Sequence, residues 1–360
     1  IQRAAEVIKK SCLVKITKEP AVSSVTTKSM TMPAAPSHTV TKKTRIGIVG
    51  CGLMGNMHLT AYKTNPDVAI VAYADSDIGK AQQCSSRVKA NTYSSHKQML
   101  ANEQLDGISI CTVPSTHRGI VLDALEAGVN VLCEKPLAVS VAEAEEMTAK
   151  ARQKNKLLLT AFKFRFFEEV QRAKELLDKK GLGKITCFRL MFGGYINMDG
   201  SWYANKAVSG GGVVMDNGPH AFDLIRHLFG EIKNISAQLT RLQDIDVEDT
   251  ARLNLVLENG AAGTVDISWS TPVPAVNYLE IYGTEGTALL DFNGFSYKFK
   301  TWNELKRVPN ALNAKEAFAK QIDHFVDTLT TNRPSVTKNH DGLIAQQWIE
   351  RAYNSVQVNR

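Results

Sequence analysis

Three glycines spaced as Gly50-x-Gly52-x-x-Gly55 constrain the fold of this 360-residue chain more than any other feature of its sequence. A short β-branched run, 45–49, precedes them, and a stretch of helical character follows them as far as residue 64. Glycines at a strand-to-helix junction permit a tight turn and leave the N–H groups of the first helical turn open to a phosphate. The motif therefore predicts the first βα unit of a dinucleotide-binding sheet.

An acidic residue, Asp75, follows the next predicted strand, 69–74, and stands 20 residues after Gly55, the spacing typical of dinucleotide-binding units. Its carboxylate can accept hydrogen bonds from both ribose hydroxyls of NAD, and its charge would repel the 2′-phosphate of NADP. No arginine follows Asp75 directly, although Lys80 and Arg87 keep NADP possible. We therefore expect NAD as the cofactor.

Apolar runs of strand length alternate with helical stretches up to residue 161. This alternation is typical of βαβ units in a doubly wound parallel sheet, an α/β Rossmann fold. Ligands of such sheets bind beyond the carboxyl ends of the strands, where the sequence places 112–117 and Glu134-Lys135-Pro136.

After residue 161 the pattern changes to alternating segments joined by turn signals at 258–260 and 283–286. An open, mainly antiparallel sheet with covering helices fits this pattern, so an α+β domain should follow the α/β domain. We predict a Rossmann domain over 44–163 and a substrate-binding and oligomerisation domain over 164–360.

Residues 1–43 have no sustained apolar period, and we expect them to be a disordered extension whose natural start is Met30 or Met32. Residues 1–45 hold nine basic and two acidic residues, which account for the whole net charge of +7. The remainder is neutral, so a nucleic-acid-binding face is not expected. The extension lacks the apolar core of a secretory signal, and no run is long enough to span a membrane. The six cysteines form no metal-binding spacing, so we expect a cytoplasmic protein without a metal site.

A glycine-rich segment, 209–223, carries the second candidate group of residues. Asp216 and His220 are four residues apart and would share one face of a helix. A histidine beside a carboxylate suits proton transfer near neutral pH. By itself the segment fits a solvated helix face or a packed histidine equally well.

Taken in order, the glycine motif, Asp75, Glu134-Lys135-Pro136 and the 210–223 segment resemble the Gfo/Idh/MocA family of sugar and polyol dehydrogenases. The resemblance extends from residue 44 to the C-terminus. Two departures are visible: Ser115 stands where the family often has asparagine, and Arg165-Phe166 lacks the proline that often follows, which weakens a ligand role for Arg165.

The resemblance implies that Lys135, Asp216 and His220 surround the reacting carbinol. His220 would be the general base, Lys135 would stabilise the developing alkoxide, and Asp216 would orient substrate hydroxyls and keep His220 basic. Whether Lys135 or His220 takes the proton stays open at this point. The expected cofactor contacts are Gly50, Gly52, Leu53, Met54, Gly55, Asp75, Thr112, Pro114, His117, Glu134 and Lys135. The expected substrate contacts are Lys135, Trp202, Asp216, Asn217 and His220.

The function expected from this set is hydride transfer between a secondary alcohol of a sugar, inositol or related polyol and NAD. Three alternatives use the same fold: an NAD-dependent glycoside hydrolase acting through transient oxidation, a reductase of a keto or unsaturated substrate, and a non-catalytic sugar-sensing regulator. A homodimer or homotetramer formed through the open sheet is the expected assembly.

Overall fold

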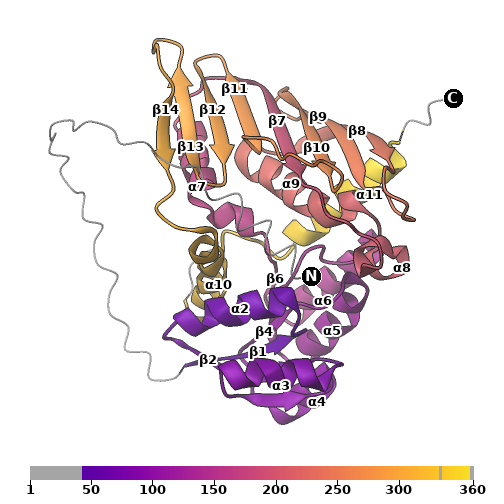
Figure 1. The fold of residues 1–360 in the computed structure, drawn as a ribbon. Coiled ribbons are helices and arrows are strands. Elements are labelled where there is room, and N and C mark those ends of the chain that lie inside the picture. The colour runs from indigo at the N-terminus through magenta and orange to yellow at the C-terminus, as the bar shows by residue number, and fades with distance from the viewer. Residues whose placement is uncertain (1–42, 332–334, 357–360) are drawn as a thin grey trace, which may run out of the picture. The chain divides into compact units, whose positions relative to one another are not determined.

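The computed structural model describes residues 43–331 and 335–356 and contains two sheets (Figure 1). The first has six parallel strands in the order β3-β2-β1-β4-β5-β6. The strands are β1 (Thr44–Val49), β2 (Val68–Ala74), β3 (Asn91–Tyr93), β4 (Gly107–Ile110), β5 (Asn130–Cys133) and β6 (Leu158–Thr160). The predicted doubly wound sheet is confirmed.

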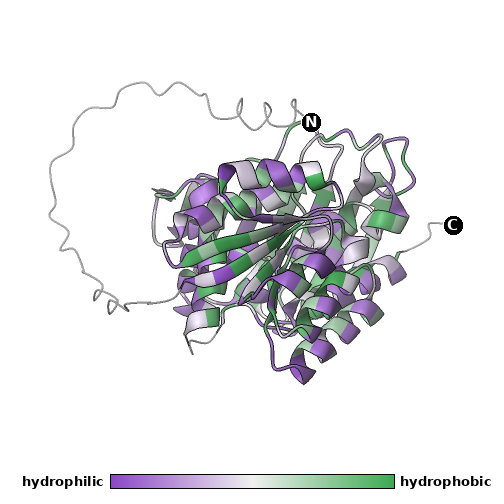
Figure 2. Ribbon diagram, turned by 90° about the horizontal axis from the view of Figure 1, so that it is seen from below, coloured by the Kyte–Doolittle hydropathy of each residue, from purple (hydrophilic) through white to green (hydrophobic). Residues whose placement is uncertain are grey.

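Helices connect these strands and cover the sheet. They are α2 (Leu53–Thr64), α3 (Ile78–Arg87), α4 (His96–Asn102), α5 (Pro114–Glu126) and α6 (Val141–Gln153). Side chains of Asp77, Ser95 and Ser140 cap the first turns of α3, α4 and α6, which defines where those helices begin. Figure 2 shows largely hydrophobic strands between helices whose outward faces are more hydrophilic, as both-sided burial of a parallel sheet requires.

The second sheet has eight strands in the order β14-β13-β12-β11-β7-β10-β9-β8. Its neighbours are antiparallel except for β7 and β10, which are parallel, so the expected mainly antiparallel sheet is confirmed. The strands are β7 (Ile185–Gly193), β8 (Ile232–Thr240), β9 (Thr250–Leu257), β10 (Ala262–Ser268), β11 (Leu279–Gly283), β12 (Gly286–Asp291), β13 (Gly294–Phe299) and β14 (Lys306–Pro309).

Helices from several parts of the chain accompany this sheet. They are η1 (Lys163–Phe166), α7 (Glu168–Asp178), η2 (Trp202–Ala204), α8 (Lys206–Ser209), α9 (Val213–Phe229), α10 (Ala314–Thr330) and α11 (Asp341–Asn354). Thirteen of the seventeen residues of α9 are buried, because this helix lies between the sheet and α11. A helix held on both sides in this way is a rigid support for side chains at its N-terminal end.

Helix α10 belongs to the later part of the sequence but packs on the first sheet. Its Phe318, Ile322 and Phe325 share a buried cluster with Ile46 and Ile48 of β1. Residues 43–331 and 335–356 belong to one compact unit, so the domain division at 163 stays a prediction. The expected disorder and natural start of the extension concern residues 1–42, which lie outside the described part of the chain. In the part that is described, no helix is long and apolar enough to cross a membrane.

Candidate active site

The glycine loop between β1 and α2 has the geometry of a nucleotide cradle. Gly50 has a φ of +89°, and a Cβ at that position would lie 2.6 Å from the carbonyl oxygen of Cys111. A Cβ on Gly55 would lie 1.9 Å from the carbonyl oxygen of Gly50. Gly52 is the N-cap residue of α2 and provides no side-chain cap, and a Cβ there would meet no described atom within 4 Å. The loop therefore needs glycine and leaves the first N–H groups of α2 open to an anion, which fits a pyrophosphate.

The carboxylate of Asp75 lies directly beside this loop. Its Oδ2 accepts a hydrogen bond from the N–H of Cys51 at 2.7 Å, and its Oδ1 accepts one from the N–H of Asp77 at 2.9 Å. Leu53 is 79% exposed at the start of α2, and Met54 next to it is half-buried. The structure thus brings the acid, the glycines and the first turn of α2 together, as a ribose-and-pyrophosphate site requires.

The loop after β4 holds the next group of expected cofactor contacts. Thr112 accepts a hydrogen bond from Thr116, and Pro114 occupies the first turn of α5. His117 is fully buried, with Nδ1 2.9 Å from the carbonyl oxygen of Pro136 and Nε2 3.2 Å from that of Thr112. The structure does not support a cofactor contact for His117, because its ring joins two backbone segments inside the protein.

Lys135 and Asp216, 81 residues apart in sequence, form an ion pair at the carboxyl end of β5. Lys135 Nζ donates to Asp216 Oδ1 at 2.5 Å and to the backbone carbonyl of Asp216 at 3.0 Å. Trp269 Nε1 donates to Asp216 Oδ2 at 3.3 Å. Burial alone would lower the pKa of Lys135, but the charge and hydrogen bond of Asp216, together with the nearby Tyr203 and Glu134, outweigh burial and raise it. Lys135 is therefore an ammonium at neutral pH.

His220 is 6% exposed and lies one helical turn after Asp216 on α9. Its Nδ1 is buried and has no hydrogen-bond partner within residues 43–331 and 335–356. Burial lowers the pKa of His220 well below its usual value, and the charges of Lys135 and Lys163 lower it further. The imidazole is therefore neutral and able to accept a proton. None of the described hydrogen bonds joins it to Asp216, so the expected support of His220 by that carboxylate is not seen.

Aromatic side chains line the approach to Asp216. Trp202 is 37% exposed and stacks on Tyr203 with ring centroids 3.7 Å apart, and Tyr203 meets Trp269 edge-on. Burial, together with the charge of Asp216, raises the pKa of Tyr203 to about 12. Trp202 thus belongs to a wall that reaches the site. Asn217, the residue after Asp216, has no described contact with Lys135 or His220.

Two polar residues near the site, one buried and one half-buried, were missed from the sequence. His58 on α2 is fully buried; its Nε2 lies 3.0 Å from Glu134 Oε1, and its Nδ1 lies 3.0 Å from Ser109 Oγ. Tyr62 continues this chain at 2.8 Å from Ser109 Oγ. Burial raises the pKa of Glu134, but the hydrogen bond from His58 and the nearby positive charges together outweigh burial and leave the pKa lowered. The second residue that was missed from the sequence is Lys163, the first residue of η1. A lone histidine or lysine among apolar residues has no spacing that marks it.

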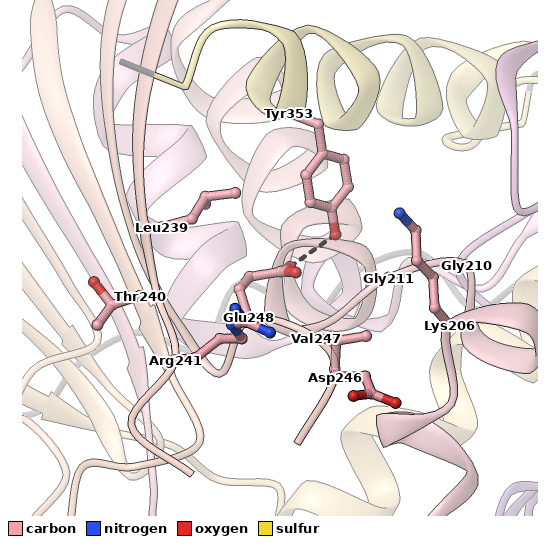
Figure 3. A pocket seen from close by; sticks show the side chains of 10 residues that line it. All are labelled: Lys206, Gly210, Gly211, Leu239, Thr240, Arg241, Asp246, Val247, Glu248 and Tyr353. Atoms are coloured by element: carbon pink, nitrogen blue, oxygen red, sulfur yellow. Dashed lines mark hydrogen bonds between the residues drawn. The ribbon is translucent and has the colours of Figure 1, made fainter. Parts of the chain in front are cut away.

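The N-terminus of α9 is fixed by Glu248, which borders a separate cavity of about 420 Å³ (Figure 3). The Glu248 carboxylate accepts hydrogen bonds from the N–H groups of Gly212 and Val214 and from the hydroxyl of Tyr353. None of the proposed catalytic side chains lines this cavity. Glu248 contributes to the site by holding the first turn of the helix that carries Asp216 and His220.

A buried ion cluster holds the same helix further along. Arg165 donates to both carboxylate oxygens of Asp223 and lies 2.9 Å from Asp341 Oδ2 on α11. Arg165 is 7% exposed and Asp223 is 2% exposed. Arg165 is therefore a structural residue that joins η1, α9 and α11, in agreement with the weakened ligand role expected from the sequence.

Comparison with known proteins gives matches along most of the described chain. Residues 44–162 match the model of an oxidoreductase family with an NAD-binding Rossmann fold, and residues 170–289 match the Gfo/Idh/MocA C-terminal domain. Mouse trans-1,2-dihydrobenzene-1,2-diol dehydrogenase is 31% identical over 252 residues, which cover 68% of this chain and 73% of the mouse protein. D-apiose dehydrogenase of Paraburkholderia graminis is 29% identical over 259 residues, covering 70% of this chain and 68% of that protein.

A solved structure supports the same fold. GenD2 from gentamicin A biosynthesis, crystallised with NAD, is 27% identical and superposes with a TM-score of 0.79. The superposition covers 89% of this chain and 95% of GenD2.

Proposed function

Because the chain belongs to the Gfo/Idh/MocA oxidoreductase family and carries its NAD-binding Rossmann fold, we propose that it oxidises a secondary alcohol of a sugar, inositol or related polyol. The observation that carries the proposal is the joining of Lys135 and Asp216 across the two halves of the chain, with a neutral His220 one turn away. The name of the apiose dehydrogenase relative supports a sugar substrate.

The residues that would hold NAD are those of the glycine loop and Asp75. The open first turn of α2 suits the pyrophosphate, and the Asp75 carboxylate suits the ribose hydroxyls of NAD. When bound, NAD supplies the hydride-accepting chemistry, which no side chain can provide.

His220 would remove the proton of the reacting hydroxyl. Its lowered pKa leaves the ring neutral at physiological pH, the form that can accept a proton, at the expense of basicity. Lys135 is the weaker candidate for the base, since its raised pKa keeps it protonated. Its ammonium would instead donate to the substrate oxygen and stabilise the charge that develops there. Asp216 would keep Lys135 oriented through their ion pair.

The experiment that tests this proposal is a screen of sugars, inositols and polyols with NAD and with NADP. We expect reduced nicotinamide to form, with a higher kcat/KM for NAD than for NADP. An aryl glycoside belongs in the screen, because release of the aryl group would show the glycoside-hydrolase alternative. Formation of no reduced cofactor with any member of the panel would contradict the proposal.

We also propose that the chain forms a homodimer or homotetramer through its second sheet. Alternate residues of β9 face away from the core, including Arg252, Asn254 and Val256, which are exposed. Light scattering of the purified protein tests this assembly. A cytoplasmic location stays a proposal as well, supported by the free thiols of Cys51, Cys84, Cys111, Cys133 and Cys187.

A further inference from the structure

Lys163 lies at the same edge of the first sheet as the proposed catalytic residues. Strands β5 and β6 are parallel, with Cys133 opposite Thr160, so the segments that follow them leave the sheet at one level. Lys135 comes two residues after β5, and Lys163 comes three residues after β6. The Nζ of Lys163 is 5.6 Å from the centre of the Phe164 ring.

The ring of Phe164 also connects this lysine to the base. Its centroid is 5.1 Å from that of His220, in an edge-on contact. The half-buried ammonium of Lys163 and the imidazole of His220 therefore lie against one aromatic ring. This placement makes Lys163 part of the wall of the reaction site.

The ammonium of Lys163 has no hydrogen bond or ion pair with any described residue. The carboxylate oxygens of Glu134 and Asp216 accept their described hydrogen bonds from other donors, and neither acid has a described contact with the Lys163 ammonium. A lysine ammonium has three donors and gains its stability in a protein interior from an acceptor. The site therefore holds a cation whose hydrogen-bonding capacity is unused.

The electrostatic surroundings agree with this description. Burial lowers the pKa of Lys163, and the neighbouring charge of Lys135 lowers it further, against the opposing effect of Glu134 and Asp216. Two ammonium groups near one another in a partly buried site repel each other. An anion that entered the site would remove this unfavourable interaction and would bind more tightly than a neutral group of the same shape.

We propose that Lys163 binds an anionic substituent of the substrate, a carboxylate or a phosphate ester on a sugar or polyol whose carbinol lies against Lys135 and His220. This inference rests on the proposed function and narrows its substrate class. NAD places its phosphates at the glycine loop, so they do not account for a cation on η1.

The test compares matched neutral and anionic substrates. We would measure kcat/KM with NAD for D-glucose, D-glucuronate and D-glucose 6-phosphate, and for D-galactose and D-galacturonate. The glucuronate and phosphate arms distinguish the two anions. The wild-type protein should prefer one anionic member by at least about 10-fold, which is the worth of one charge-assisted hydrogen bond.

Lys163→Met should reduce that preference roughly 10- to 100-fold, through a higher KM for the anionic substrate and an unchanged KM for NAD. Lys163→Arg should retain most of the preference. Lys206→Met is the control, because Lys206 lines the separate cavity beside α9. Preference of the wild type for neutral sugars would overturn the proposal. So would a Lys163→Met variant that weakens NAD and leaves the anionic preference intact.

A binding measurement separates this inference from the proposed function. If no sugar, inositol or polyol were oxidised, the proposed function would be contradicted, and calorimetry of D-glucuronate with the NADH-loaded protein would test the role of Lys163 by binding alone. Binding that Lys163→Met abolishes and Lys163→Arg retains would support the proposal. Absence of binding, or equal binding by Lys163→Met, would overturn it.

Discussion

Replacement of Arg165 with methionine tests the buried ion cluster that holds α9 in place. The guanidinium donates to both oxygens of Asp223, contacts Asp341 and donates to the carbonyl of Val336 at 2.5 Å. Arg165→Met would leave two carboxylates buried, at 2% and 4% residue exposure, without their main counter-charge. Breaking a buried pair from one side costs about 3–5 kcal/mol, so the melting temperature should fall by roughly 6–20 °C.

The same replacement at an exposed pair supplies the control. Arg118 makes an equally bidentate contact with Glu146, but both side chains are more than two-fifths exposed. Arg118→Met should change the melting temperature little, because water screens this exposed ion pair and can hydrogen-bond to Glu146 when the arginine is absent. Thermal unfolding followed by circular dichroism would compare the two variants. Equal melting temperatures would refute the assignment of Arg165 as a buried structural cation.

The deficit of Arg165→Met should also depend on pH. Burial raises the pKa of Asp223 to about 6 even with Arg165 present, and loss of the arginine should raise it further. An acid whose folded pKa exceeds its unfolded pKa destabilises the fold when it is ionised, and its cost grows as the pH rises from the unfolded to the folded value, so raising the folded pKa extends that cost to higher pH. The loss of stability should therefore be smaller at about pH 5 than at about pH 8. A deficit that grew on acidification would contradict this reasoning.

Three further predictions concern the site. Asp75→Asn keeps an acceptor for the Cys51 N–H but removes the charge, so the preference in kcat/KM for NAD over NADP should fall by roughly 10-fold; an unchanged preference would count against the ribose assignment. The acidic limb of the wild-type pH–rate profile should lie below pH 6.5, since burial lowers the pKa of His220. His220→Ala should lose that limb and lower kcat/KM by about 10²-fold. A variant that kept both the limb and the wild-type kcat/KM would show that His220 has only a packing role. His58→Leu removes the donor that keeps the pKa of Glu134 low, so kcat should fall and its pH profile should shift, whereas His58→Gln should recover part of both; a change in stability alone would make His58 purely structural.

Local rules were enough to predict the nucleotide-binding half. The glycine spacing, the β-branched run before it and Asp75 all lie within one βαβ unit, so short-range sequence carries the information. The structure places Asp75 against the Cys51 N–H in the way that such a unit requires. The join of Lys135 to Asp216 was expected only from the resemblance to a family, because nothing periodic links residues 81 positions apart.

Other features depend on packing that no local pattern encodes. The parallel pairing of β7 with β10 places side by side two strands that are far apart in the chain. Helix α10 packs on the first sheet, although its apolar face could equally cover either sheet as far as the sequence shows. His117 lies in the segment 112–117 that was expected to contact the cofactor, yet each nitrogen of its ring lies against a backbone carbonyl. Lys163 and His58 owe their positions to the same long-range packing.

We propose that an alcohol is oxidised at the site built from Lys135, Asp216 and His220. The most direct test is the steady-state rate of NADH formation by the wild type and by Lys135→Met on the preferred substrate of the screen, alongside the dissociation constant for NAD. Lys135→Met should lower kcat/KM by about 10²-fold or more and leave NAD binding within a few-fold, because the glycine loop and Asp75 are intact. A Lys135→Met variant that formed NADH as fast as the wild type would contradict the account.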